Sequence, residues 1–274
     1  MSSATSKRSA SAHEAPKSPV QSDKRPPASD INWNPWLGVV FVVVVYFVSQ
    51  LIAGSLVTLY PLSMHWSNAR ATDWLNNSIG AQFAYVLMAE VLVIGSVYWF
   101  LRFRKLGLAA IGLKRPRWSD PVYGLAALPL YFILYLLAVT VVSHFVPSLN
   151  INEQQQLGFN NVHGAEPLIL TFISLVILPP LAEEIMVRGF LYSSLKKAMP
   201  MAGAVIATSA IFAAAHLPEG GAAGPLYIAA LDTFVLSLVL IYLREKTGSL
   251  WASITLHALK NGIAFTALFA LHLK

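Results

Sequence analysis

The sequence contains no cysteine and few charged residues, and each shortage excludes a class of protein. Without cysteine among its 274 residues, the chain can form no disulfide, no thiolate zinc site and no cysteine nucleophile. Charged residues make up 12% of the chain, about half the roughly 25% of a soluble domain, while hydrophobic residues make up 56%. So little charge cannot coat a water-facing surface, which excludes an ordinary cytosolic globule. So much apolar sequence excludes a disordered chain, and we expect an integral membrane protein.

Seven apolar stretches follow a polar N-terminal segment. Residues 1–35 are rich in Ser, Ala, Pro and basic residues without an apolar run, so we expect a disordered tail. The apolar stretches cover residues 37–60, 80–101, 121–146, 167–191, 202–217, 226–243 and 250–272. Lipid offers no partner for backbone groups, so an open sheet is excluded and the stretches must be helices. The sequence predicts an all-α, polytopic bundle of about seven transmembrane spans, with residues 36–274 as one helical domain.

Basic residues are distributed unevenly between the two sides of the expected membrane. Sixteen of the 19 Lys and Arg lie in the tail or around residues 102–117, 188–197 and 244–246, and only Arg70 and Lys274 lie opposite. Cytoplasmic loops carry such an excess, so we expect a cytoplasmic N-terminus, most simply in a bacterial inner membrane rather than the endoplasmic reticulum. The net charge of +6 thus reflects membrane topology. The expected partner is the lipid bilayer and not nucleic acid.

Six charged residues fall inside the apolar stretches. A charged side chain at the bilayer centre costs roughly 2.5 to 3.5 kcal/mol, so each needs a partner, a water-filled cavity or a function. They are Glu90, Glu183, Glu184, Arg188, Asp232 and Lys260. Glu184 and Arg188 are one helical turn apart and can pair. Glu183 is turned about 100° from Glu184 and presents its carboxylate to another surface. A structural cluster of ion pairs is the alternative for these two glutamates. Glu90 and Asp232 could line the cavity, but pairing of either one with Lys260 is the simpler interpretation.

Two prolines, Pro179 and Pro180, stand just before this cluster. Proline has no backbone N–H, so the pair leaves the carbonyls around Leu175 and Val176 without their helical hydrogen-bond donors. We therefore expect the helix to break at this point.

Two later stretches carry an imidazole one helical turn from another distinctive side chain. Phe212-Ala-Ala-Ala-His216 ends the fifth stretch, and His257-Ala-Leu-Lys-Asn261 lies in the seventh. A lone histidine in a membrane more often makes an interhelical hydrogen bond than a catalyst, but two of them beside an unpaired glutamate favour catalysis. At about 1.5 Å per residue, these side chains and Glu183 lie roughly 10 to 21 Å from the cytoplasmic edge. Convergence in one water-accessible chamber is therefore expected.

In chain order, the patterns Glu-Glu-x-x-x-Arg, Phe-x-x-x-His and His-x-x-x-Asn resemble those of the CPBP (Abi) family of intramembrane CAAX-processing and bacteriocin-processing proteases. The resemblance covers about residues 165–272, which would form the catalytic core. One departure is Val187, where the family often has Phe before the arginine. The resemblance implies hydrolysis of peptide bonds inside the membrane, without a covalent intermediate, in a peptide or membrane-protein substrate that carries a lipid in the CAAX case.

The resemblance also implies a role for each motif residue. Glu183 would be the general base, and His216 would hold and polarise the attacking water. His257 and Asn261 would donate hydrogen bonds to the developing oxyanion. The supporting residues would be Glu184, Arg188 and Phe212.

Metal dependence and two other functions stay open at this point. A His₂Glu zinc set could be made by Glu183, His216 and His257. The zincin pattern, in which two histidines flank a glutamate on one helix, does not occur. We therefore favour a mechanism without an obligatory metal. A non-catalytic membrane scaffold or immunity protein could be built on the same helices. A proton- or ion-coupled transporter using Glu90, Glu183 and Asp232 is disfavoured because the sequence has no internal repeat and no evenly polar pathway through several spans.

Overall fold

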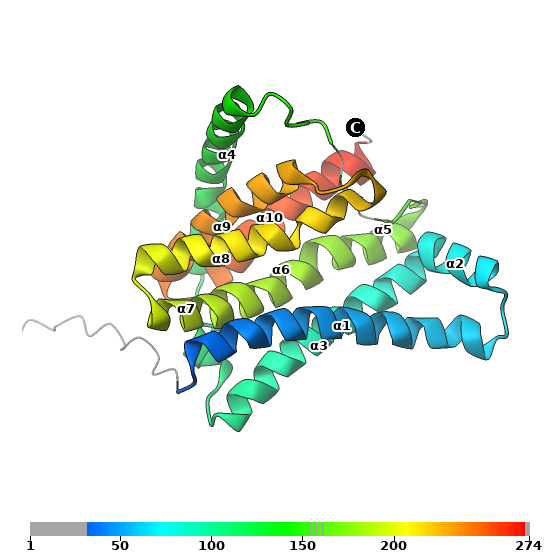
Figure 1. Ribbon diagram of the computed structural model, residues 1–274, viewed down its shortest axis with the longest axis horizontal. Helices are drawn as coiled ribbons and strands as arrows, with labels where there is room; N and C mark the ends of the chain where they lie inside the picture. Colours follow the sequence, from blue (N-terminus) through cyan, green and yellow to red (C-terminus); the bar gives the residue numbers. More distant parts are fainter. Residues whose placement is uncertain (1–31, 154, 157, 161, 272–274) are drawn as a thin grey trace, which may run out of the picture. The chain divides into compact units, whose positions relative to one another are not determined.

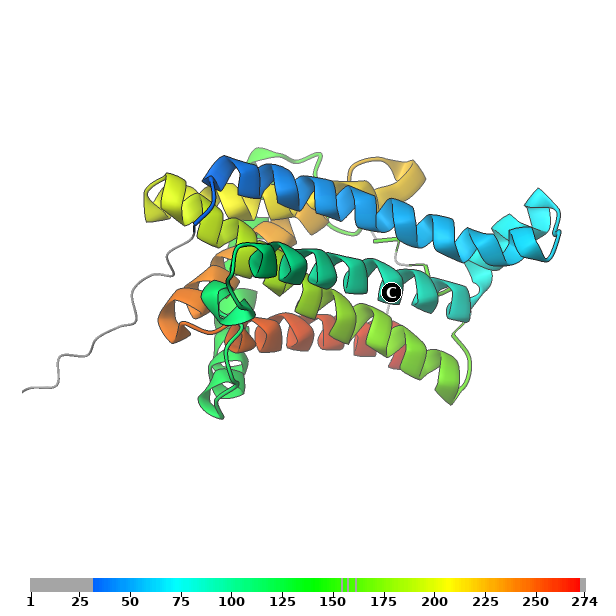
Figure 2. The same cartoon turned by 90° about the horizontal axis from the view of Figure 1, so that it is seen from below.

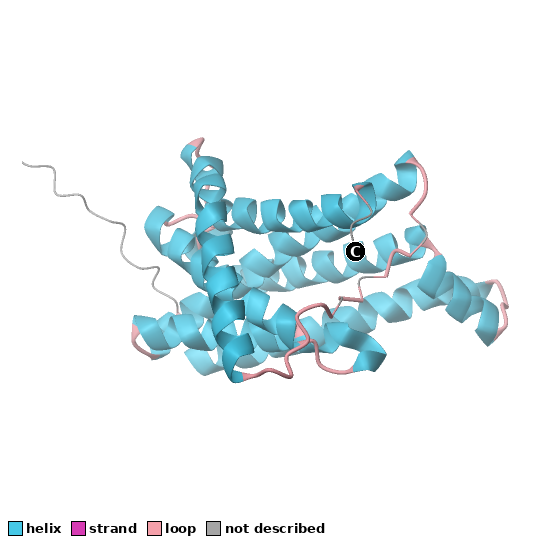
Figure 3. Cartoon of the chain, turned by 90° about the horizontal axis from the view of Figure 1, so that it is seen from above, coloured by secondary structure: helices cyan, strands magenta, loops and turns pink. Residues whose placement is uncertain are grey.

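The computed structural model describes residues 32–153, 155–156, 158–160 and 162–271. Residues 1–31 of the predicted tail lie outside the described residues. The prediction is wrong for the last residues of the tail, because Trp33 is buried and stacks on Phe190 and a helix begins at Pro35. The described residues form helices joined by loops and contain no strand (Figures 1 and 3). The all-α prediction is therefore confirmed.

Six helical segments are long and apolar enough to cross a membrane. They are α1 (Pro35–Ser63), α3 (Ile79–Phe103), α4 (Ser119–Phe145), the continuous segment Ala165–Ala198, the segment Met201–Gly221 that begins with α8 (Met201–Ala215), and α9 (Tyr227–Thr247). The expected seventh span, α10 (Trp251–Phe265), is not among the six because polar side chains at His257, Lys260 and Asn261 interrupt its apolar sequence. The polytopic helical bundle is confirmed, and the span count roughly agrees.

One feature between the spans was not predicted. A short helix, α2 (Asn68–Asn77), follows α1 and begins at Ser67, whose hydroxyl accepts a hydrogen bond from the Arg70 backbone N–H. Such a serine cap is a common start of a helix. Because its sequence is polar, apolar periodicity gave no signal for it.

The segment that carries Glu183 is one continuous helix with two π turns. Its parts are α5 (Ala165–Phe172), the π turn η2 (Ile173–Ile177), α6 (Leu178–Glu183), the π turn η3 (Glu184–Leu191) and α7 (Tyr192–Ala198). The predicted break at Pro179–Pro180 is wrong. The wider π turn before the prolines accommodates their rings and missing N–H groups, so the helix continues.

The helices pack in two groups that meet along the continuous segment. α1 packs against α3 and α7, and α3 also contacts α6, as Figure 2 shows for the helices beside α1. α9 packs between α8 and α10, and α4 crosses α9 and α10 (Figure 1). The approach of α4 to α10 is close, because a Cβ atom on Gly124 would lie 2.7 Å from the carbonyl oxygen of Ala252. Small residues permit such contacts where lipid supplies no hydrophobic drive to associate.

Large apolar side chains remain exposed on the outer faces of α1, α3 and α4. Leu51 is 71% exposed, Trp99 69% and Leu136 62%. A soluble protein rarely presents contiguous apolar surface on this scale, whereas a lipid-facing helix requires it. The exposure therefore agrees with the apolar composition in placing these helices in a bilayer.

Candidate active site

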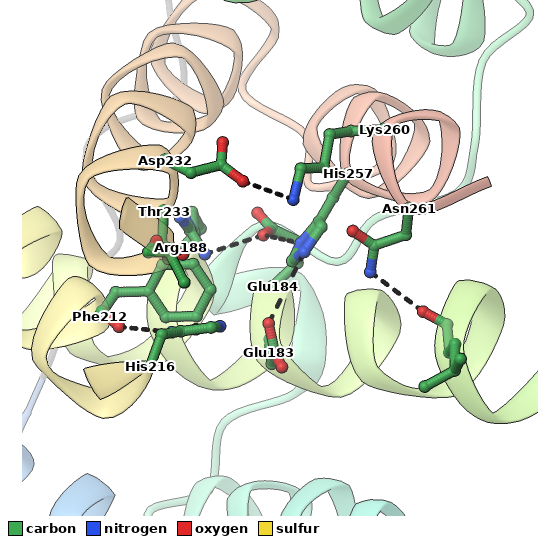
Figure 4. A network of polar contacts seen from close by, with 12 residues as sticks. Glu183, Glu184, Arg188, Phe212, His216, Asp232, Thr233, His257, Lys260 and Asn261 are labelled. Atoms are coloured by element: carbon green, nitrogen blue, oxygen red, sulfur yellow. Dashed lines mark hydrogen bonds and ion pairs between the residues drawn. The ribbon is translucent and has the colours of Figure 1, made fainter. Parts of the chain in front are cut away.

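One cavity of about 300 Å³ collects the four candidate catalytic side chains. Glu183 ends α6, His216 caps the C-terminus of α8, and His257 and Asn261 lie on α10. Figure 4 shows His257 joined to Glu183 by a dashed contact, with His216 on one side of this pair and Asn261 on the other. The predicted convergence is therefore present in the fold.

Glu184 and Arg188 form the predicted ion pair, with Arg188 Nη1 2.9 Å from Glu184 Oε1 and both side chains fully buried. The guanidinium also lies over the ring of Phe212, 4.1 Å from its centroid. A buried guanidinium needs such compensation because it has left water. The pair fixes this turn of the helix, and Phe212 links it to α8.

His257 lies between the two glutamates, a contact that the sequence did not predict. Its Nδ1 is 3.0 Å from Glu184 Oε1, and its Nε2 is 3.7 Å from Glu183 Oε2. An ionised carboxylate only accepts hydrogen bonds, so the Nδ1 proton faces Glu184. Glu184 therefore orients the ring and turns Nε2 toward Glu183 and the cavity.

Phe212 also fixes the second imidazole. His216 Nδ1 lies 2.8 Å from the backbone carbonyl oxygen of Phe212, and the two rings meet edge to face at 4.7 Å. Because a carbonyl only accepts, Nδ1 carries the proton, and Nε2 of the neutral ring keeps its lone pair. The Phe-x-x-x-His spacing thus sets both the position and the tautomer of His216.

Asn261 is anchored to the segment that contains the prolines. Its Nδ2 donates a hydrogen bond to the carbonyl oxygen of Leu175 at 3.0 Å. An α turn would pair that carbonyl with residue 179 and a π turn with residue 180, and both are proline. Asn261 therefore replaces the missing backbone donor, while the second proton of its amide stays available.

A second polar cluster lies on the cavity wall beside the first. Lys260 Nζ is 2.7 Å from Asp232 Oδ2, and the Tyr131 hydroxyl donates a hydrogen bond to Asp232 Oδ1. The predicted pairing with Lys260 is thus present for Asp232. It is wrong for Glu90, which lies on the cavity wall on α3.

Glu219 was missed in the sequence analysis. It lies in the turn that follows α8, with its Oε1 3.9 Å from His216 Nε2, and its Oε2 accepts a hydrogen bond of 2.7 Å from Gln155 Nε2. The spacing of three residues after His216 was the available signal. Gln155 belongs to a loop, and no sequence pattern indicated that it reaches the cavity.

The zinc set that the sequence left open is not assembled in this arrangement. Throughout the part of the chain that the structure describes, no three His, Asp or Glu side chains are grouped so that they could hold a metal ion. Glu183 and His257 lie 3.7 Å apart, and no third donor of the described residues, His216 included, groups with them. The donor set therefore does not fit a bound zinc ion, and no step below is derived through one.

The fold and the cavity together define a polytopic membrane protein with a cavity that collects several polar side chains. Residues 165–263 match the family model described as Type II CAAX prenyl endopeptidase Rce1-like, and all three motifs lie within the match. The CAAX-protease-like family that the motifs predict is confirmed over residues 165–263. No curated protein and no solved structure matches the chain.

Proposed function

We propose that the protein is an intramembrane endopeptidase in which Glu183 activates a water molecule for attack on a peptide bond. The observation that carries this proposal is the contrast between the adjacent glutamates. Glu184 is fully buried and neutralised by Arg188, whereas the side chain of Glu183 is 24% exposed and lines the cavity. Glu183 thus has the accessible carboxylate, whereas Glu184 holds the His257 ring in place from outside the cavity.

The geometry supports a direct hydrolysis. Glu183 takes a proton from the water, the resulting hydroxide attacks the substrate carbonyl, and the same carboxyl returns the proton to the leaving amine. His216 Nε2, whose lone pair is fixed by the Nδ1 contact with Phe212, accepts the second hydrogen of the water. No covalent acyl intermediate forms, since the nucleophile is the water itself.

The developing oxyanion is stabilised by donors on α10. Asn261 offers the amide proton that Leu175 does not use, and His257 offers Nε2–H when both ring nitrogens are protonated. Glu184, 3.0 Å from Nδ1, balances the charge of that imidazolium. Each such donor contributes about 2.7–4 kcal/mol to the stability of the transition state.

The setting of the reaction is part of the same proposal. The substrate is a peptide or membrane protein, in the CAAX-like case a lipidated one, that enters the cavity from the membrane or its cytoplasmic face. The N-terminus is cytoplasmic, and the helical domain of residues 36–274 lies in a bacterial inner membrane, with the catalytic core at about 165–272.

Replacement of Glu183 by Gln is the experiment that tests the mechanism. The change keeps the size of the side chain and removes the base, so cleavage should fall by about 10²–10⁴-fold with normal folding. The measurement is mass-spectrometric detection of products from a peptide library, with the purified protein in liposomes. Glu166→Gln, at an exposed carboxylate near the start of α5, is the matched control. Cleavage that persists in Glu183→Gln contradicts the mechanism, and biological activity without cleavage would favour a scaffold.

A further inference from the structure

Glu90 is a charged residue within a span that neither the proposed chemistry nor an ion pair explains. It lies near the middle of α3, outside the residues 165–263 that match the family, and it lines the cavity. Among the described residues, no cation and no hydrogen-bond donor contacts its carboxylate, although Glu183 lies close enough to interact with its charge. An intramembrane charge is costly, so a carboxylate that no partner compensates suggests a ligand.

Carboxylates outnumber cations on the described wall of the cavity. Glu90, Glu183, Glu219 and Asp232 line it, whereas its one Lys or Arg, Lys260, is already engaged by Asp232 at 2.7 Å. Acidic side chains therefore outnumber basic ones on this wall. A positively charged group that enters meets Glu90 without competition from a protein cation.

Two tyrosines complete the wall around this part of the cavity. Tyr46 comes from α1 and Tyr85 from α3, and both line the same cavity as Glu90. The Tyr85 hydroxyl donates a hydrogen bond to Gln50 Oε1 on α1, which fixes the ring. Aromatic rings beside a carboxylate are well suited to a lysine or arginine side chain, because the ring face attracts a cation.

We propose that Glu90 is a specificity-determining residue that binds a lysine or arginine side chain of the peptide substrate. The proposal rests on the proposed function, which places the peptide in this cavity. Because one cavity of about 300 Å³ contains both Glu90 and Glu183, the recognised residue must lie close to the scissile bond. The family-like domain then supplies the chemistry, while α1 and α3 select the substrate.

The test compares peptides that differ by one charge. The probes are short apolar peptides with a single lysine moved along the sequence, each paired with the same peptide carrying Nε-acetyllysine. Binding is measured to the full-length Glu183→Gln protein in phosphatidylcholine nanodiscs, whose neutral lipid does not itself concentrate basic peptides. At one or more positions the lysine peptide should bind about tenfold more tightly than its acetylated partner.

Removal of Glu90 should abolish this preference. In the Glu183→Gln/Glu90→Gln protein the ratio of the two dissociation constants should fall to about one, whereas Glu183→Gln/Glu166→Gln should retain it. Equal binding of the paired peptides by Glu183→Gln at every position, or a preference that survives Glu90→Gln, overturns the proposal. Because binding is measured without cleavage, failure of the wild-type protein to cut a bound peptide counts against the proposed function alone.

The stability of the variant separates recognition from a structural role. Replacing an uncompensated carboxylate by a neutral amide should leave the melting temperature unchanged or raise it. If Glu90→Gln does not fold, the proposal is also overturned, since a carboxylate kept free for a substrate is not needed for folding.

Discussion

The helices of residues 165–271 and those of residues 32–145 differ in how they are buried. Half of the most apolar window of α9 and 39% of that in Ala165–Ala198 are buried inside the protein, against 22% in α3 and 11% in α4. Only α1 and the segment Met201–Gly221 are equal, at 28% each, among these six helical segments. The family match and the motifs fall in the more buried region. Charges inside that region are enclosed by protein partners, whereas the first helices mainly present apolar side chains to lipid.

This difference assigns separate tasks to the two regions. The C-terminal region supplies the carboxylates, imidazoles and amide that converge on the cavity, each held by a specific contact. The N-terminal region supplies another part of the cavity wall, including Tyr46 and Glu90, without enclosing Glu90 in an ion pair. A side chain that faces lipid is less constrained than one that packs against a buried charged group. Substitutions should therefore be tolerated better in the N-terminal region than in the C-terminal region.

Arg188→Met should have the largest effect on stability. It removes the cation from Glu184, which is fully buried, and the cation–π contact with Phe212. Breaking a buried pair in this way costs about 3–5 kcal/mol, because the remaining carboxylate is left uncompensated. Unfolding in detergent, followed by tryptophan fluorescence, measures the loss.

Two control variants identify the origin of this loss. Arg102→Met removes an exposed arginine at the end of α3 and should change stability by no more than about 0.5 kcal/mol. Glu184→Gln/Arg188→Met removes both charges and should recover most of the stability of Arg188→Met. If the double variant is no more stable than Arg188→Met, an uncompensated carboxylate is not the cause.

A matched pair of leucines compares the two regions directly. Leu240 on α9 is fully buried, whereas Leu137 on α4 is 58% exposed. Leu240→Ala should cost about 2 kcal/mol, the low end of the usual range, because in a membrane the lost packing is not supplemented by transfer from water. Leu137→Ala should cost less than about 0.5 kcal/mol, since lipid fills the space. Equal losses, measured by the same unfolding assay, would mean that α4 is packed as tightly as α9.

Much of the fold follows from residues that can be read directly in the sequence. Long apolar stretches without charge must be helices in lipid, so the spans were predicted within a few residues of their ends. The Glu184–Arg188 pair follows from helical spacing and the cost of a buried charge. The seventh predicted stretch became α10, which is not among the six long apolar helices because its polar residues lower its apolar character.

Contacts between helices could not be derived in this way. Nothing in the sequence near Glu184 shows that a residue 73 positions away will place its Nδ1 on that carboxylate, as His257 does. Periodicity describes one helix at a time, and the pairing of helices depends on the packing of all of them. The same reason explains why Glu90 was expected to pair with Lys260, although Asp232 reaches that lysine instead.

The continuity of the helix through Pro179 and Pro180 leads to the prediction with the smallest expected effect, a coupling between Asn261 and the two prolines. Asn261→Leu keeps the approximate size of the side chain but leaves the Leu175 carbonyl without its donor, which should cost about 1–3 kcal/mol of stability. In a Pro179→Ala/Pro180→Ala background a backbone N–H is available to Leu175 whether that turn is α or π. The cost of Asn261→Leu should then shrink by about 1 kcal/mol, and unfolding of the four proteins of this double-mutant cycle measures the coupling. An unchanged cost would show that Asn261 stabilises α10 by some contact other than the replacement of a donor that the prolines lack.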